Sequence, residues 1–367
     1  MFYKSFYTTE TPNETNYTID MLYKGVAPTA PTIYEPPRKK TIRTETNYFS
    51  VNTVHLNALK QILKRPRTAP WRYTEYHIPK ATGGFRLITA PCEELKNTQR
   101  EVASMLRRLG AVAHDAAFAY EPYRTAKDAM VRHKTEHHNW FYKLDIKDFF
   151  PSCTTEVLQT VLEQVYPFCC FDEETLTLLI ECATYKDCLP QGSPLSPLLC
   201  NMVLTPFDFI MQYSVKPFDG TYTRYADDIL ISTPNRHQLN FIEYLVQKHL
   251  NEVSTSFKLK KEKSRCGSKN GANWNLGLML NKDNNVTLGH KKKMELKAKI
   301  NNFIFDFTNK KYWSIIDTQV LQGELNYFKT IEPDYANFVI NRLQQKYKTS
   351  CTLAEMFSAI ITERVHN

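Results

Sequence analysis

The sequence predicts an α+β protein, in which antiparallel strand pairs are combined with separate helices. Side-chain character alternates along residues 222–232 on both sides of a tight turn, whose tip is Ala226 to Asp228. Residues 76–91 form two further β-prone runs, which are joined by a turn at residues 82–84. Residues 240–253 carry apolar side chains at helical spacing, and the chain from His290 onward is helical and basic. Strand pairs and helices together therefore define the fold class.

Length and charge set the broad class of protein. A chain of 367 residues with 42% hydrophobic content can bury a large core in two or three subdomains. The net charge of +9 favours a polyanionic partner, and binding to it should weaken steeply with salt.

The cysteines and the apolar runs indicate where in the cell the protein is expected. The nine cysteines form no CxxC pair, which favours reduced thiols in a cytoplasm over disulfides or zinc. The sequence shows no signal peptide, and its apolar runs are too short and interrupted to span a bilayer. We therefore expect a cytoplasmic protein that needs no membrane.

Residues 1–45 differ in composition from the rest of the chain. Thr, Tyr, Asn and Pro dominate there, and helix formation is interrupted by Pro28, Pro31, Pro36 and Pro37. We expect an extended arm, which is either a solvated tail or a segment that wraps a structured RNA or a neighbouring subunit. A basic amphipathic helix over residues 51–63 then begins the folded part.

Acidic residues lie in two tracts that are otherwise apolar and β-prone. Asp227 and Asp228 lie at a predicted hairpin tip, and Asp145 lies in a predicted strand within residues 141–150, surrounded by apolar residues. Adjacent acids in a turn commonly just cap or solvate the bend. Buried carboxylates without partners are costly, however, and Mg²⁺ prefers such hard oxygen ligands. His133, His137 and His138 lack a nearby cysteine, so we expect an exposed helix end there rather than a metal cluster.

A proline-rich segment lies between the two acidic tracts. Residues 189–201 read Leu-Pro-Gln-Gly-Ser-Pro-Leu-Ser-Pro-Leu-Leu-Cys-Asn, in which prolines fix a turn into a helix from about Leu195. These three tracts, in this order, resemble the motifs of a bacterial reverse transcriptase, a group that includes group II intron, retron and phage-defence enzymes.

The resemblance implies a right-hand polymerase with fingers, palm and thumb. Residues 46–140 would form the fingers, with the hairpin at 76–91. Residues 141–285 would form the palm, an antiparallel sheet with helices, interleaved with the fingers around 155–190. Residues 286–367 would form a helical thumb and a short tail.

The resemblance also assigns the catalytic residues. Asp145, Asp227, Asp228 and the carbonyl of Ile146 would bind two Mg²⁺ ions, for which Mn²⁺ could substitute. Lys263 would protonate the leaving pyrophosphate. Asp148 is left out, because a solvated strand end explains its charge equally well.

The nucleotide pocket is assigned in the same way. Lys80 and Arg86 would face the triphosphate, although both could be merely exposed hairpin charges. Phe150 would stack under the sugar and exclude a 2′-hydroxyl, and Gln191 and Gly192 would line the pocket. Further along the template path, Arg124 is the expected template contact, and Lys96 would meet template phosphate.

The predicted function is RNA-templated DNA synthesis from dNTPs, which leaves an RNA/DNA duplex. We expect an antiviral role together with an associated structured noncoding RNA. The sequence leaves open whether the protein also forms a homo-oligomer or binds an accessory protein. A template-independent terminal nucleotidyltransferase and a catalytically silent RNA-binding scaffold are the alternatives. Asn275-Leu276-Gly277 departs from the Val-Thr-Gly usual in retron enzymes, which weakens a retron assignment. Little chain follows the expected thumb, which disfavours a self-sufficient mobile intron protein.

Overall fold

The structure is a computed structural model, and it describes residues 51–66, 73–79, 83–269 and 277–362. The expected arm at 1–45 and Lys80 lie outside the described residues. The described part begins with a helix, a hairpin and a second helix: α3 (Thr53–Leu63), β1 (Tyr73–Pro79), β2 (Phe85–Pro91) and α4 (Glu93–Arg108). β1 and β2 pair antiparallel with Pro79 opposite Phe85, which confirms the predicted hairpin. α3 begins after Asn52, whose side chain accepts a hydrogen bond from the amide of His55.

A four-stranded antiparallel sheet forms the centre of the molecule. Its strands are ordered β4-β5-β3-β6, with bounds β3 (Trp140–Asp145), β4 (Thr221–Tyr225), β5 (Asp228–Thr233) and β6 (Arg265–Ser268). The strand pairs confirm the antiparallel sheet that the tracts around 145 and 228 predicted.

Helices pack on one face of this sheet. Between β3 and β6 the chain forms α6 (Phe149–Ser152), α7 (Thr155–Leu162), α8 (Glu173–Ala183), α9 (Ser196–Val203), α10 (Thr205–Ser214) and α11 (Leu239–Val253), with 3₁₀ turns η1 (Phe168–Cys170), η2 (Lys216–Phe218) and η3 (Lys261–Lys263). α5 (Ala126–Arg132) precedes β3. Apolar side chains of α10 and α11 share one buried core with β3 and β5 through Phe207, Val246, Tyr142 and Ile229.

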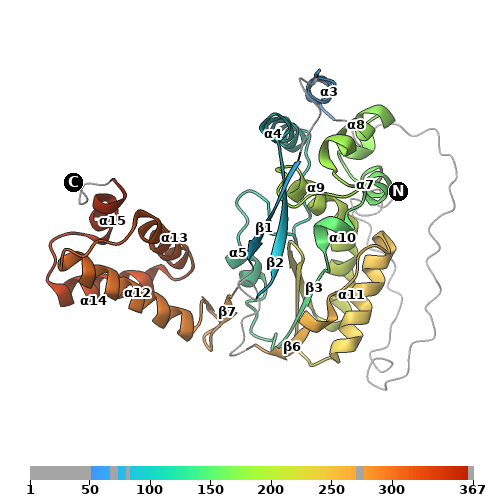
Figure 1. The fold of residues 1–367 in the computed structure, drawn as a ribbon. Helices are drawn as coiled ribbons and strands as arrows, with labels where there is room; N and C mark the ends of the chain where they lie inside the picture. Colours follow the sequence, from blue (N-terminus) through green and yellow to red (C-terminus); the bar gives the residue numbers. More distant parts are fainter. Residues whose placement is uncertain (1–50, 67–72, 80–82, 270–276, 363–367) are drawn as a thin grey trace.

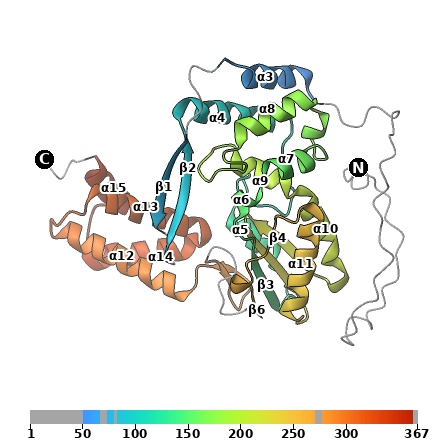
Figure 2. The ribbon, with the colours of Figure 1, turned by 45° about the vertical axis from the view of Figure 1, so that its right-hand side comes forward.

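A second buried cluster holds the C-terminal helices together. After the short strands β7 (Met279–Leu280) and β8 (Val286–Thr287), the chain forms α12 (His290–Thr308), α13 (Ile315–Ile331), α14 (Pro333–Tyr347) and α15 (Leu353–Ile361). Figures 1 and 2 show these four helices as a group on one side of the sheet, with α9, α10 and α11 on the other side. The helices predicted beyond His290 are thereby confirmed.

The two clusters contact opposite faces of the sheet, since side chains alternate along a strand. Tyr142 and Leu144 belong to the first cluster, whereas Phe141 lies in the second. By the same alternation Asp145 lies on the face of Phe141. The acidic end of β3 therefore belongs to the sheet face that is turned away from the main core. Within the described ranges, no helix combines the length and apolar character that crossing a bilayer requires.

Candidate active site

Strand pairing brings the three predicted acids together. Asp145 ends β3 and lies directly opposite Asp228, the first residue of β5. Because Asp228 also pairs with Tyr225 of β4, Ala226 and Asp227 form a two-residue hairpin turn. Ala226 has a φ of 57°, the left-handed conformation that such turns require. The Ile146 amide donates to the Asp227 carbonyl at 3.0 Å and so ties this turn to the end of β3.

Two lysines form ion pairs with two of the three acids. Lys263 Nζ lies 2.6 Å from Asp145 Oδ2, and Lys143 Nζ lies 2.9 Å from Asp228 Oδ2. Burial, followed by the charges of Asp145 and Asp228, raises the pKa of Asp227. Burial alone would lower the pKa of Lys263, but its hydrogen bond to Asp145 and the three acidic charges raise it, so the lysine stays cationic.

The backbone places Lys263 beside the acids. The Lys260 amide donates to the Asp145 carbonyl at 2.8 Å, and the Lys147 amide donates to the Lys258 carbonyl at 2.7 Å. These bonds flank the bridge between Ile146 and Leu259. The 3₁₀ turn that carries Lys263 is therefore fixed at the end of β3.

The donor set suits a divalent cation in its chemistry. Three carboxylates at one strand end are the hard oxygen ligands that Mg²⁺ prefers. In the part of the chain that the structure describes, however, no three His, Cys, Asp or Glu side chains are arranged to hold one ion, and Asp145 and Asp228 are paired with lysines instead. Metal binding at these acids would thus require both to exchange a lysine for the ion.

The predicted nucleotide-pocket residues lie on two neighbouring segments. Phe150 is half-buried in α6, and its ring lies 5.7 Å from that of Phe149. Gln191 and Gly192 lie against β2: the Thr89 amide donates to the Gln191 carbonyl at 2.6 Å, and a Cβ on Gly192 would lie 2.8 Å from the Thr89 carbonyl oxygen. Gly192, with a φ of 130°, thus permits a close approach to the fingers hairpin itself.

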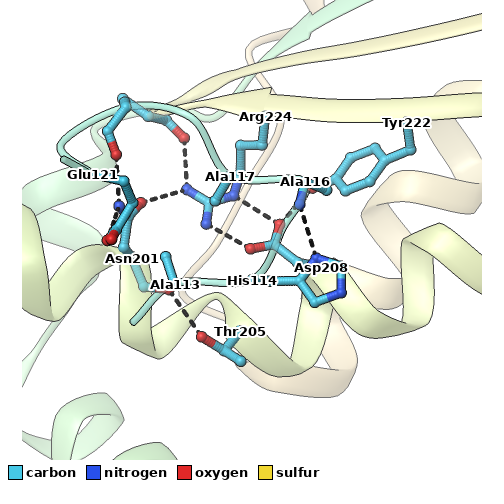
Figure 3. Close-up of polar contacts among 12 residues, drawn as sticks. Ala113, His114, Ala116, Ala117, Glu121, Asn201, Thr205, Asp208, Tyr222 and Arg224 are labelled. Carbon is cyan, nitrogen blue, oxygen red and sulfur yellow. Dashed lines mark hydrogen bonds and ion pairs between the residues drawn. The ribbon is translucent and has the colours of Figure 1, made fainter. Parts of the chain in front are cut away.

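A buried polar network next to the turn at Ala226 and Asp227 was missed by the sequence analysis (Figure 3). Arg224 of β4 and Asp208 of α10 are both fully buried and form an ion pair, with Nη2 and Oδ2 2.6 Å apart. Arg224 Nη1 also donates to the Ala226 carbonyl and to Asn201 Oδ1, both at 3.1 Å. The Tyr222 hydroxyl donates to Asp208 Oδ1 at 2.6 Å. The single acid in the apolar segment of α10, Asp208, could have indicated a buried basic partner, but the sequence does not show which residue that partner is.

The structure revises the prediction for two histidines. His133 and His138 are buried rather than at an exposed helix end, and the Nδ1 atom of each ring lies within hydrogen-bond distance of the Ser232 hydroxyl, at 2.7 and 2.8 Å. Arg124 turns inward, where its Nη1 donates to the carbonyls of His114 at 2.7 Å and of Ala117 at 2.8 Å. Its guanidinium holds its own loop, and its contact with a template stays a prediction.

The sheet, with acids gathered at the paired ends of two strands and helices behind them, is the palm of a right-hand polymerase, a class of nucleotidyltransferase. The family is given by a match over residues 78–291 to the model described as reverse transcriptase (RNA-dependent DNA polymerase). The chain belongs to this family and is an RNA-directed DNA polymerase.

Relatives of the chain are bacterial retron enzymes. It is 29% identical over 295 residues to the retron Ec83 reverse transcriptase of Escherichia coli, covering 78% of this chain and 89% of that protein. It is 27% identical over 315 residues to the retron Mx65 reverse transcriptase of Myxococcus xanthus, covering 82% and 71%. The expectation that residues 275–277 weaken a retron-like assignment was therefore wrong. Asn275 and Leu276 lie outside the described residues.

Among solved structures, apo telomerase from Candida tropicalis matches with a TM-score of 0.46 at 13% identity, covering 80% of this chain and 62% of that one. At this score the likeness carries no weight for function.

Proposed function

We propose that this reverse transcriptase adds deoxynucleotides by in-line phosphoryl transfer at Asp145, Asp227 and Asp228. The observation that supports the proposal most is the pairing of Asp145 with Asp228 beside the turn that carries Asp227. Burial, followed by the charges of Asp145 and Asp228, raises the pKa of Asp227, which supports a site that attracts cations. Clustered carboxylates of this kind are suited to binding divalent cations.

The acids, with the Ile146 carbonyl, would hold two Mg²⁺ ions or Mn²⁺ in their place. Such ions stabilise the charge that develops on the attacking and leaving oxygens. Lys263, which pairs with Asp145 in this structure, would give a proton to the leaving pyrophosphate once the metal ions replace it at the carboxylate.

The incoming dNTP would be held by residues around the acids. Arg86 on β2, together with Lys80, would bind its triphosphate. Gln191 and Gly192 would line its pocket. Phe150 would lie under its sugar and exclude a 2′-hydroxyl.

We propose the same division of the chain as the sequence suggested, with fingers at 46–140, palm at 141–285 and thumb at 286–367. The exposed Lys291 and Lys292 at the start of α12 support a thumb that follows the RNA/DNA duplex. Free cysteines, including the exposed Cys169 and Cys351, support a cytoplasmic location. A structured noncoding RNA as partner and a role in antiviral defence are proposed by family analogy.

Primer extension on a homopolymer RNA template tests the enzymatic proposal. The wild type should incorporate only the template-dictated dNTP. Asp227→Asn should lose roughly a thousandfold or more of the rate, because charge stabilisation at such a site is worth several kcal/mol, while RNA binding persists. Asp219→Asn is the matched control, since Asp219 is an exposed acid in the left-handed region just before β4. Untemplated product would instead indicate a terminal transferase, and normal synthesis by Asp227→Asn would remove the assignment.

Sequencing the nucleic acid that copurifies with the protein tests the proposed partner. One dominant structured RNA is expected. A heterogeneous mixture of cellular RNA would contradict a dedicated noncoding RNA.

A further inference from the structure

The loop between α4 and α5 carries two tyrosines in a strained backbone conformation. Tyr120 and Tyr123 both have a φ of 62°, in the left-handed region that aromatic residues rarely adopt. Such strain costs on the order of 1–3 kcal/mol and persists only where surrounding contacts enforce it. The surroundings of the two tyrosines differ.

Contacts from two helices fix the backbone of Tyr120. Arg107 of α4 donates through Nη2 to the Tyr120 carbonyl at 2.9 Å and pairs through Nη1 with Glu121 Oε2 at 2.5 Å. Asn201 of α9 donates through Nδ2 to the Ala119 carbonyl at 2.7 Å. The loop is thus held on both sides of Tyr120, which sets the direction of its side chain.

That side chain lies beside the predicted sugar contact. The ring of Tyr120 lies 6.3 Å from that of Phe150 with an interplanar angle of 59°, a tilted arrangement typical of interacting aromatic pairs. Burial and then the charge of Asp227 raise the pKa of Tyr120 to about 12, and the charge of Arg86 acts in the opposite direction. The phenol is therefore near both the catalytic turn and the hairpin that would hold the triphosphate.

We propose that Tyr120 is a positioning residue for sugar selection: its ring supports Phe150 and so sets the space at the 2′ position of the incoming nucleotide. This inference rests on the proposed role of Phe150. The ring of Phe150 has two aromatic neighbours, Phe149 at 5.7 Å and Tyr120 at 6.3 Å. Without the Tyr120 ring, Phe150 gains rotameric freedom and excludes a 2′-hydroxyl less strictly.

The test measures kcat/KM for dGTP and for GTP on one template–primer. Tyr120→Ala should lower the dGTP/GTP ratio roughly 2- to 10-fold, the range for loss of one aromatic pair, chiefly through a lower KM for GTP. Tyr120→Phe should keep the ratio. Tyr123→Ala is the matched control, because Tyr123 shares the loop and the backbone conformation but is fully exposed at 102%.

Two further variants distinguish the role of Tyr120 from the proposed sugar contact of Phe150. Phe150→Ala should collapse the ratio, and the Tyr120→Ala/Phe150→Ala double variant should match Phe150→Ala alone, since Tyr120 acts through Phe150. If Phe150→Ala leaves the ratio unchanged, the proposed sugar contact fails. If it collapses the ratio while Tyr120→Ala does not lower it, the role of Tyr120 is refuted. Tyr120→Asn, which tolerates the left-handed backbone, replaces Tyr120→Ala if that variant does not fold.

Discussion

Replacing Asp208 with Asn should destabilise the whole palm. Asp208 and Arg224 have fully buried side chains, and the carboxylate accepts from Arg224 Nε at 2.8 Å, from Nη2 at 2.6 Å and from the Tyr222 hydroxyl at 2.6 Å. Burial favours the neutral form of Arg224, yet the charge of Asp208 raises its pKa overall, so the guanidinium stays charged. An amide at position 208 leaves that charge buried without compensation.

The expected loss of unfolding free energy is about 3–5 kcal/mol, the usual cost of removing one partner from a buried pair. Urea denaturation followed by fluorescence measures it. Asp115→Asn is the matched control, because Asp115 pairs with Arg124 at 3.3 Å but is 77% exposed, and such surface pairs contribute about 0–1 kcal/mol. Asp208→Leu combined with Arg224→Met should recover much of the loss. A cost for Asp208→Asn no larger than that for Asp115→Asn would refute this reasoning.

Two other predictions concern His133 and Gly192. Burial, with smaller effects of His138 and Arg132, lowers the pKa of His133 to about 3, whereas an unfolded histidine titrates near 6.5. Its contribution to stability is therefore complete above pH 6.5 and is lost towards pH 3, by up to about 1.4 kcal/mol per pH unit. His133→Gln should flatten the fall of urea midpoints between pH 7 and pH 5, and an unchanged slope would contradict the assignment. Gly192→Ala should cost about 1–3 kcal/mol of unfolding free energy, because its φ is 130° and its Cβ would lie 2.8 Å from the Thr89 oxygen. Gly323→Ala, within α13 and with nothing within 4 Å, should instead stabilise by about 0.5–1 kcal/mol, and equal effects of the two substitutions would count against this explanation.

The sequence predicted those parts of the fold that depend on local pattern. Residues 240–253 have helical apolar spacing and form α11, and the alternation around Asp227 gives the β4–β5 hairpin. The strand predicted within residues 141–150 is confirmed, but it ends at Asp145, before the strand end expected at Asp148.

Features that depend on distant partners could not be predicted. Asp208 is balanced by Arg224, which comes from a different element. Likewise, His133 and His138 meet at Ser232, nearly a hundred residues further along the chain, and the sequence around the histidines alone suggests an exposed helix end. The inward turn of Arg124 depends on carbonyl groups of a loop whose conformation no short motif specifies.

Asp145, Asp227 and Asp228 are proposed to act together as a binding site for divalent cations. Electron paramagnetic resonance titration with Mn²⁺ in the presence of dTTP and template–primer measures this directly. We expect two bound ions for the wild type and for Asp219→Asn, and the loss of at least one for Asp227→Asn while the variant remains folded. Undiminished Mn²⁺ binding by folded Asp227→Asn would contradict the account.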